Sequence, residues 1–134
     1  MKTDRFDKPS TSYKPSKQVE YVNVYRVEKR GRGPFQTNSH GDFMHDHLPT
    51  PQHDGGLPRM DEDEIEPFRF GAPTEEALKE WVKRPKMLDK LGYKVSLYKV
   101  KKGYVHSSDI QSMFIKRHAK KVMEWGVQEF MKGN

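Results

Sequence analysis

The chain of 134 residues contains no cysteine. This absence excludes disulfide bonds, thiol catalysis and zinc sites built from cysteine. Hydrophobic residues make up only 33% of the chain, and no apolar run approaches the roughly 20 residues of a membrane-spanning helix. The first residues also lack the apolar stretch of a signal peptide. We therefore expect a soluble, cytoplasmic protein without membrane contact, whose small hydrophobic core relies on aromatic side chains.

Composition divides the chain into two parts. Residues 1–17 are rich in proline, serine, threonine and charge, with little to bury. Such a segment predicts a flexible leader that orders only against a partner. The remaining residues, 18–134, have room for a single compact domain with one core.

Positive charge is concentrated toward the C-terminus. Residues 79–134 contain fourteen Lys or Arg and five Asp or Glu, whereas Asp61–Glu66 forms an acidic block. A basic surface attracts nucleic acid, the phosphates of a nucleotide or an acidic protein. A solvated lysine-rich face without a partner is the alternative.

A β-branched and aromatic run over residues 19–28 predicts the first strand. Arg26 shares one face of this strand with Val22 and Val24. A buried guanidinium is costly without a partner, so Arg26 requires either a ligand or a carboxylate from Asp61–Glu66.

The basic segment Lys29–Phe35 follows this strand and is punctuated by two glycines. Its backbone amides and the side chains of Arg30 and Arg32 form a candidate anion site. The spacing matches neither the Walker pattern nor the dinucleotide fingerprint, and a charged, solvated turn is an equal interpretation.

The most legible stretch runs from Phe68 to Trp81 and predicts a strand end, a turn and a capped helix. Thr74 is expected to accept a hydrogen bond from the amide of Ala77. Leu78 and Trp81 follow at helical spacing and provide a buried stripe.

Beyond Trp81 the pattern predicts a short helix closed by Gly92, a strand over residues 93–100 and a short strand over residues 111–115. A terminal helix is expected to carry Ile115, Ala119, Val122, Gly126 and Phe130 on one face. On that helix Lys116, Arg117, Lys120 and Lys121 form a basic face, since they make two pairs four residues apart. Tyr98 or Tyr104 would then supply stacking for a nucleic acid.

The predicted fold class is α+β, with a small, mostly antiparallel sheet and two or three helices.

The long polar segment between residues 36 and 60 is rich in histidine. His45 and His47 are its natural metal-ligating pair, but they match no known metal signature, and histidine-rich surface loops are common. We therefore assign no metal to this chain.

The order of several short motifs resembles a group of short, mostly uncharacterised proteins of phages and actinobacterial genomes. The resemblance extends from Tyr21 to Ala119. In chain order the landmarks are YRVE ending at Glu28, GPF ending at Phe35, HLPTP at residues 47–51, Phe70-Gly71, Trp81 and Gln111-x-x-Phe114.

The layout of that group in turn resembles a reduced ADP-ribosyltransferase-type fold. Enzymes of that type hold nicotinamide dinucleotide with an Arg or His on the first strand, and they use a hydroxyl residue and a late Glu. By this resemblance Arg26 matches the first position, Thr74 the second, and Gln111 stands in place of the Glu. Glutamine can hydrogen-bond a ribose hydroxyl, but it lacks the charge that supports an oxocarbenium-like transition state. The resemblance thus implies a pocket that binds NAD or ADP-ribose without reacting.

The favoured hypothesis is a small phage-type accessory protein, acting in the host cytoplasm, that binds a nucleotide-derived ligand or a host protein. Arg26, Thr74 and Gln111 would line its pocket, and Arg30 and Arg32 would lie near the phosphates of the ligand.

Two alternatives stay open. The first is an ADP-ribosyltransferase-like enzyme, which needs another carboxylate, such as Asp109, in place of the missing Glu. The second is a module that binds nucleic acid or inhibits a host protein through the basic C-terminal face.

Overall fold

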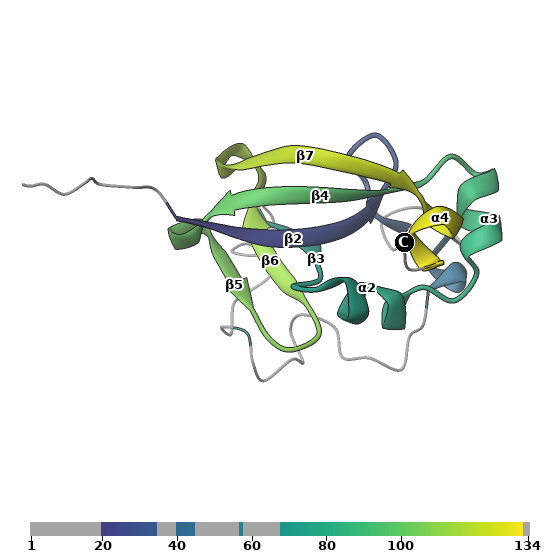
Figure 1. Ribbon diagram of the computed structural model, residues 1–134, viewed down its shortest axis with the longest axis horizontal. Helices are drawn as coiled ribbons and strands as arrows, with labels where there is room; N and C mark the ends of the chain where they lie inside the picture. Colours follow the sequence, from purple (N-terminus) through teal and green to yellow (C-terminus); the bar gives the residue numbers. More distant parts are fainter. Residues whose placement is uncertain (1–19, 35–39, 45–56, 58–67, 133–134) are drawn as a thin grey trace, which may run out of the picture.

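The computed structural model describes residues 20–34, 40–44, 57 and 68–132. The predicted leader, the pair His45 and His47, and the acidic block Asp61–Glu66 lie outside these ranges. Within them, the chain forms two small antiparallel sheets and three α-helices, which confirms the α+β class (Figure 1). No helix in these ranges is long and apolar enough to cross a bilayer.

The first sheet has the strand order β2-β4-β7. Its central strand β4 pairs along its whole length with β2, so that Tyr21 lies opposite Lys101 and Glu28 opposite Lys94. Both of these strands were predicted from their β-branched and aromatic residues. The sheet comprises β2 (Tyr21–Glu28), β4 (Lys94–Lys101) and β7 (Ala119–Gly126).

The second sheet has the strand order β3-β6-β5. The backbone groups of Tyr25 in β2 and Ala72, just after β3, exchange two hydrogen bonds of 2.8 and 2.7 Å. This bridge joins the two sheets, and Figure 1 shows β3, β6 and β5 beneath the long strands of the first sheet. The sheet comprises β3 (Phe68–Gly71), β5 (Val105–Ser107) and β6 (Ser112–Ile115).

The three α-helices gather at the end of the molecule where β4 begins and β7 ends (Figure 1). The Thr74 hydroxyl accepts from the Ala77 amide at 3.0 Å, which confirms the predicted N-cap. Gly92 follows the second helix with a φ of 94°, a conformation that favours glycine. The helices are α2 (Glu75–Trp81), α3 (Pro85–Lys90) and α4 (Val127–Met131), and the short 3-10 helices are η3 (His40–Phe43), η5 (Lys102–Tyr104) and η6 (Lys116–His118).

The two faces of the β2–β4 pair cover two hydrophobic clusters. Val27 and Val95 lie opposite each other and face the larger cluster under the helices. Val24 and Tyr98 also lie opposite each other, but they face the second sheet, where the Tyr98 ring lies 5.5 Å from that of Phe114. Valines and aromatic residues make up most of both clusters, and the aromatic part agrees with the expectation from the composition.

The predicted terminal helix is wrong over most of its length. Residues 119–126 form strand β7, and only Val127–Met131 are helical. The apolar residues have helical spacing, but β4 offers a row of backbone groups that an extended segment pairs with, and Trp125 then packs against Tyr25 at 6.4 Å. Tertiary pairing overrides the helix propensity of the Ala, Lys, Met and Glu residues here.

Asp89 fixes the start of helix α4. Its carboxylate accepts from the amides of Val127 at 2.7 Å and Gln128 at 3.0 Å. Burial opposes ionisation of Asp89, but these hydrogen bonds outweigh it and hold the pKa of the carboxyl below its ordinary value.

Replacing Asp89 by Ala is expected to lower the free energy of unfolding by about 1 kcal/mol at pH 7. Because the folded-state pKa is lowered, this contribution is present above the unfolded pKa and is lost as the pH falls through the folded one. Urea denaturation at pH 7 and at pH 2.5 measures the difference between the two proteins. A difference that stays the same at both pH values would contradict this role.

Candidate functional site

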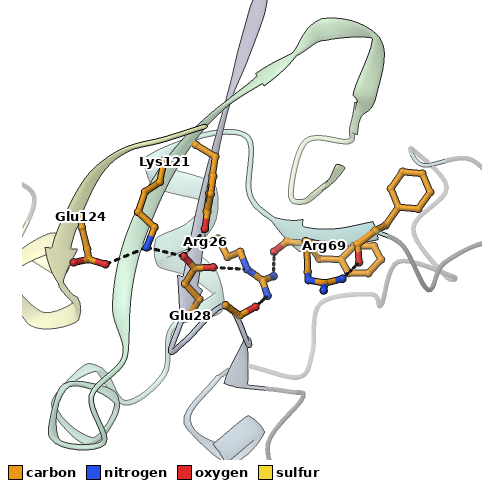
Figure 2. A network of polar contacts seen from close by, with 9 residues as sticks. Arg26, Glu28, Arg69, Lys121 and Glu124 are labelled. Atoms are coloured by element: carbon orange, nitrogen blue, oxygen red, sulfur yellow. Dashed lines mark hydrogen bonds and ion pairs between the residues drawn. The ribbon is translucent and has the colours of Figure 1, made fainter. Parts of the chain in front are cut away.

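The Arg26 guanidinium is buried, and its three nitrogens all donate hydrogen bonds. Nε donates to the Glu28 carboxylate at 3.0 Å, one terminal nitrogen to the Phe70 carbonyl at 2.6 Å, and the other to the Gly31 carbonyl at 3.0 Å (Figure 2). Arg26 thereby connects three segments, namely β2, β3 and the turn after β2. The structure gives this arginine a carboxylate in Glu28, two residues further along the same face of the strand, whereas the partner predicted from Asp61–Glu66 lies outside the described residues.

Glu28 is only 4% exposed, and both of its carboxylate oxygens have donors. Besides Arg26, it accepts from the Tyr98 hydroxyl at 2.6 Å and lies 3.3 Å from the Lys121 ammonium. Burial opposes the charge of Glu28, but the Tyr98 hydrogen bond and the positive charge of Arg26 hold its pKa below the ordinary value. Glu28 is therefore an ionised carboxylate in the interior.

An irregularity in β7 brings Lys121 to this carboxylate. Lys121 lies opposite Tyr98 and Met123 lies opposite Leu97, so Val122 is an extra residue in the strand. In an uninterrupted ladder Lys121 would point to the other face of the sheet. Figure 2 shows the result, in which Lys121 contacts both Glu28 and Glu124 at the partly exposed end of the network.

The turn held by Arg26 is a tight β-turn with two central residues. Lys29 and Arg32 exchange backbone hydrogen bonds of 2.8 and 3.0 Å, and Arg30 and Gly31 between them have φ of 54° and 81°. This pattern belongs to the tight turns of β-hairpins, where glycine is favoured at positive φ. The side chains of Arg30 and Arg32 are exposed on it.

Lys116 reaches the same turn from a distant part of the chain. A Cβ atom added at Gly31 would lie 3.0 Å from the Lys116 ammonium nitrogen. Arg30, Arg32 and Lys116 are therefore three cationic residues of one turn, since the first two belong to it and the third reaches it from η6. We call this group the cationic turn. Electrostatically it offers guanidinium and ammonium donors to an anion.

Thr74 lies on the surface, in a segment that adjoins the strand of Arg26. Ala72, two residues before it, pairs with Tyr25, the chain neighbour of Arg26. The Thr74 side chain is exposed, and its oxygen already accepts from Ala77 as the helix cap.

Gln111 belongs to the same junction of the two sheets. It precedes Ser112, whose strand partner is Gly71 in β3. The residue is only 3% exposed, and its backbone exchanges hydrogen bonds with Ser108. Arg26, Thr74 and Gln111 thus come from adjoining segments, although Thr74 is accessible and the other two are buried.

The basic face expected from Lys116, Arg117, Lys120 and Lys121 does not form. Lys116 and Arg117 lie in η6, whereas the other two lie in a strand instead of a helix. Lys120 is opposite Lys99 on the face away from Glu28, while Lys121 is on the Glu28 face. Helical spacing was the wrong basis for grouping these lysines, because the segment is extended. Of the two tyrosines considered for stacking, Tyr98 is buried and Tyr104 is exposed.

Two features of the site went beyond the sequence-based predictions. The sequence contained a signal for the pairing of Arg26 with Glu28, since residues two apart share one face of a strand. The sequence contained no signal for the approach of Lys116 to Gly31, because the two residues are 85 positions apart in the chain. Within the described ranges no group of three metal-ligating side chains occurs, and His45 and His47 lie outside them.

Comparison with known proteins gives one family. No curated protein and no solved structure matches the chain. The family model described as Bacteriophage T4 Y00F protein matches residues 20–128, which include all the strands of the described ranges. This match supports the resemblance to phage proteins that the sequence showed. The ADP-ribosyltransferase-like layout stays a prediction. The chain belongs to the bacteriophage T4 Y00F protein family.

Proposed function

We propose that this phage-family protein acts without catalysis in the host cytoplasm and binds a nucleotide-derived ligand through its phosphates. The cationic turn is the contact surface, with Arg30, Arg32 and Lys116 as the donors. The observation that carries the proposal is the approach of Lys116 to Gly31, between the two exposed arginines. A phosphate has several acceptor oxygens, so cations from two separate segments at one turn can donate to it together.

Arg26 has a positioning role in this proposal. Its three nitrogens donate to Glu28, Phe70 and Gly31, so the guanidinium holds the turn against the sheets. A turn fixed in this way loses little conformational entropy when a ligand binds, which favours affinity. Arg26 was predicted as a ligand contact, and the network instead favours an indirect contribution through Gly31.

Thr74 and Gln111 are retained as candidate contacts for the ribose or base. Thr74 is accessible, and its hydroxyl still has a hydrogen to donate. The enzymatic alternative would need a carboxylate near Gln111, and exposed Asp109 is the candidate. Incubation with labelled NAD and host lysate tests that alternative, and it fails if no label is transferred.

The proposed site is tested by isothermal titration calorimetry with ADP-ribose. We expect the Arg30→Gln/Arg32→Gln variant to bind at least about tenfold more weakly than the wild type. Each charge-assisted hydrogen bond to a phosphate contributes about 1.5–3 kcal/mol, so loss of one alone exceeds tenfold. Inorganic pyrophosphate should compete with ADP-ribose for the wild-type protein.

Lys99→Gln provides a control outside the site. This exposed lysine contacts Asn23 at 3.0 Å on the face of the first sheet away from Glu28, so its loss removes one positive charge outside the site. The affinity of the Lys99→Gln variant for ADP-ribose should equal that of the wild type within about twofold. Equal affinities for the double variant and the control, or no binding to the wild type, would overturn the proposal.

A further inference from the structure

Tyr104 and His118 form an exposed stack where the two short helices η5 and η6 meet. Their ring centroids lie 3.6 Å apart and their planes differ by 13°. Tyr104 is 39% exposed, and it is one of four large hydrophobic residues in the described ranges that remain exposed. A stacked pair at the surface contributes little to the core, so its packing alone does not explain it.

Positive charges surround this stack. Arg117 directly precedes His118 in η6, and Lys101 directly precedes η5, so both cations belong to the segments that form the stack. Partial burial, and then the charges of Arg117 and Lys101, lower the pKa of the His118 imidazole. Lys102 lies in the same short helix as Tyr104, and its ammonium contacts the exposed Glu20 carboxylate at 3.1 Å. An exposed ion pair of this kind is weak and is readily exchanged for a stronger anion.

A second exposed ring lies at the same end of the first sheet. Tyr21 is 50% exposed, and it is the strand partner of Lys101. Gly103, between Lys102 and Tyr104, is also open, since a Cβ atom added there would meet nothing within 4 Å. This end of the molecule therefore combines exposed aromatic residues with cations and with open space at Gly103.

We infer that this surface binds single-stranded nucleic acid, with Tyr104 and Tyr21 stacking on bases and Lys101, Lys102 and Arg117 neutralising phosphates. Stacking on protein rings requires unpaired bases, because the bases of a duplex already stack on one another. The cations alone would suit an acidic protein as well, and the exposed rings favour nucleic acid because every unpaired base has a face that stacks on an aromatic side chain. The inference goes beyond the proposed function, since it uses none of Arg30, Arg32 and Lys116, although Arg117 follows Lys116 in η6.

Fluorescence anisotropy with a labelled single-stranded oligonucleotide tests this inference. We expect Tyr104→Ala to weaken binding at least about fivefold, the lower end of the contribution of a base–aromatic stack. Tyr104→Phe keeps the ring and should bind within about twofold of the wild type. Affinity should fall with salt, and Arg117→Gln should reduce that dependence.

The following outcomes would overturn the inference. They are no binding of the oligonucleotide to the wild type, equal affinities of Tyr104→Ala and Tyr104→Phe, and tighter binding of a duplex of the same length. An acidic peptide that competes equally with the oligonucleotide and is indifferent to Tyr104 would assign the surface to a protein instead. The Arg30→Gln/Arg32→Gln variant should keep its oligonucleotide affinity within about twofold, which separates this test from that of the cationic turn.

Discussion

Replacing Arg26 by Met is expected to lower the free energy of unfolding by about 3–5 kcal/mol. The substitution leaves the Glu28 carboxylate, which is 4% exposed, without its closest positive charge. It also removes the donor from the carbonyl oxygens of Phe70 and Gly31. Breaking a buried ion pair by removing one partner is costly because the remaining charge stays in the interior.

Urea denaturation at pH 7 measures this effect, and Arg30→Met is the matched control. Arg30 is exposed on the turn, so its loss should change the free energy of unfolding by no more than about 0.5 kcal/mol. A loss below about 1 kcal/mol for Arg26→Met would show that the network contributes little. In that case Arg26 would again be a candidate for direct contact with a ligand.

The second large effect is expected for Gly71→Ala, which should cost about 3 kcal/mol or more. The added Cβ would lie 2.5 Å from the Tyr25 carbonyl oxygen and 2.7 Å from a methyl carbon of Val24. The oxygen belongs to the bridge between Tyr25 and Ala72 that joins the two sheets. Because that atom is backbone, relief of the clash requires β3 to move away from β2.

Gly103→Ala is the control for this substitution. A Cβ at Gly103 meets nothing within 4 Å, so the same chemical change should alter the stability by no more than about 0.5 kcal/mol. Thermal or urea unfolding of both variants gives the comparison. Equal stabilities would mean that the close approach of β3 to β2 does not hold the sheets together.

Sequence reasoning was most successful where local chemistry decides the structure. The Thr74 cap depends on residues three apart, and alternation of β-branched and aromatic residues was sufficient for β2 and β4. It failed for residues 119–126, whose composition suits a helix. Their extended form depends on β4, a strand some 20 residues earlier, and such a partner leaves no mark in local periodicity.

The same division applies to the candidate site. The need of Arg26 for a partner followed from its valine neighbours, and Arg30 and Arg32 could be named from the turn composition. Lys116 was chosen for a helix face that does not exist, yet it reaches the cationic turn through the tertiary fold. The register irregularity that directs Lys121 to Glu28 could not be predicted from the sequence either, because it depends on one extra residue in β7 relative to β4.

The most direct test of the account is to map the binding of ADP-ribose by amide chemical shifts in NMR spectra of the isotope-labelled protein. If the cationic turn is the phosphate site, the largest shifts should occur at residues 29–32 and at Lys116, and they should vanish in the Arg30→Gln/Arg32→Gln variant. Shifts centred on Thr74 and Gln111, with residues 29–32 unaffected, would contradict the account and return the ligand to the junction of the two sheets.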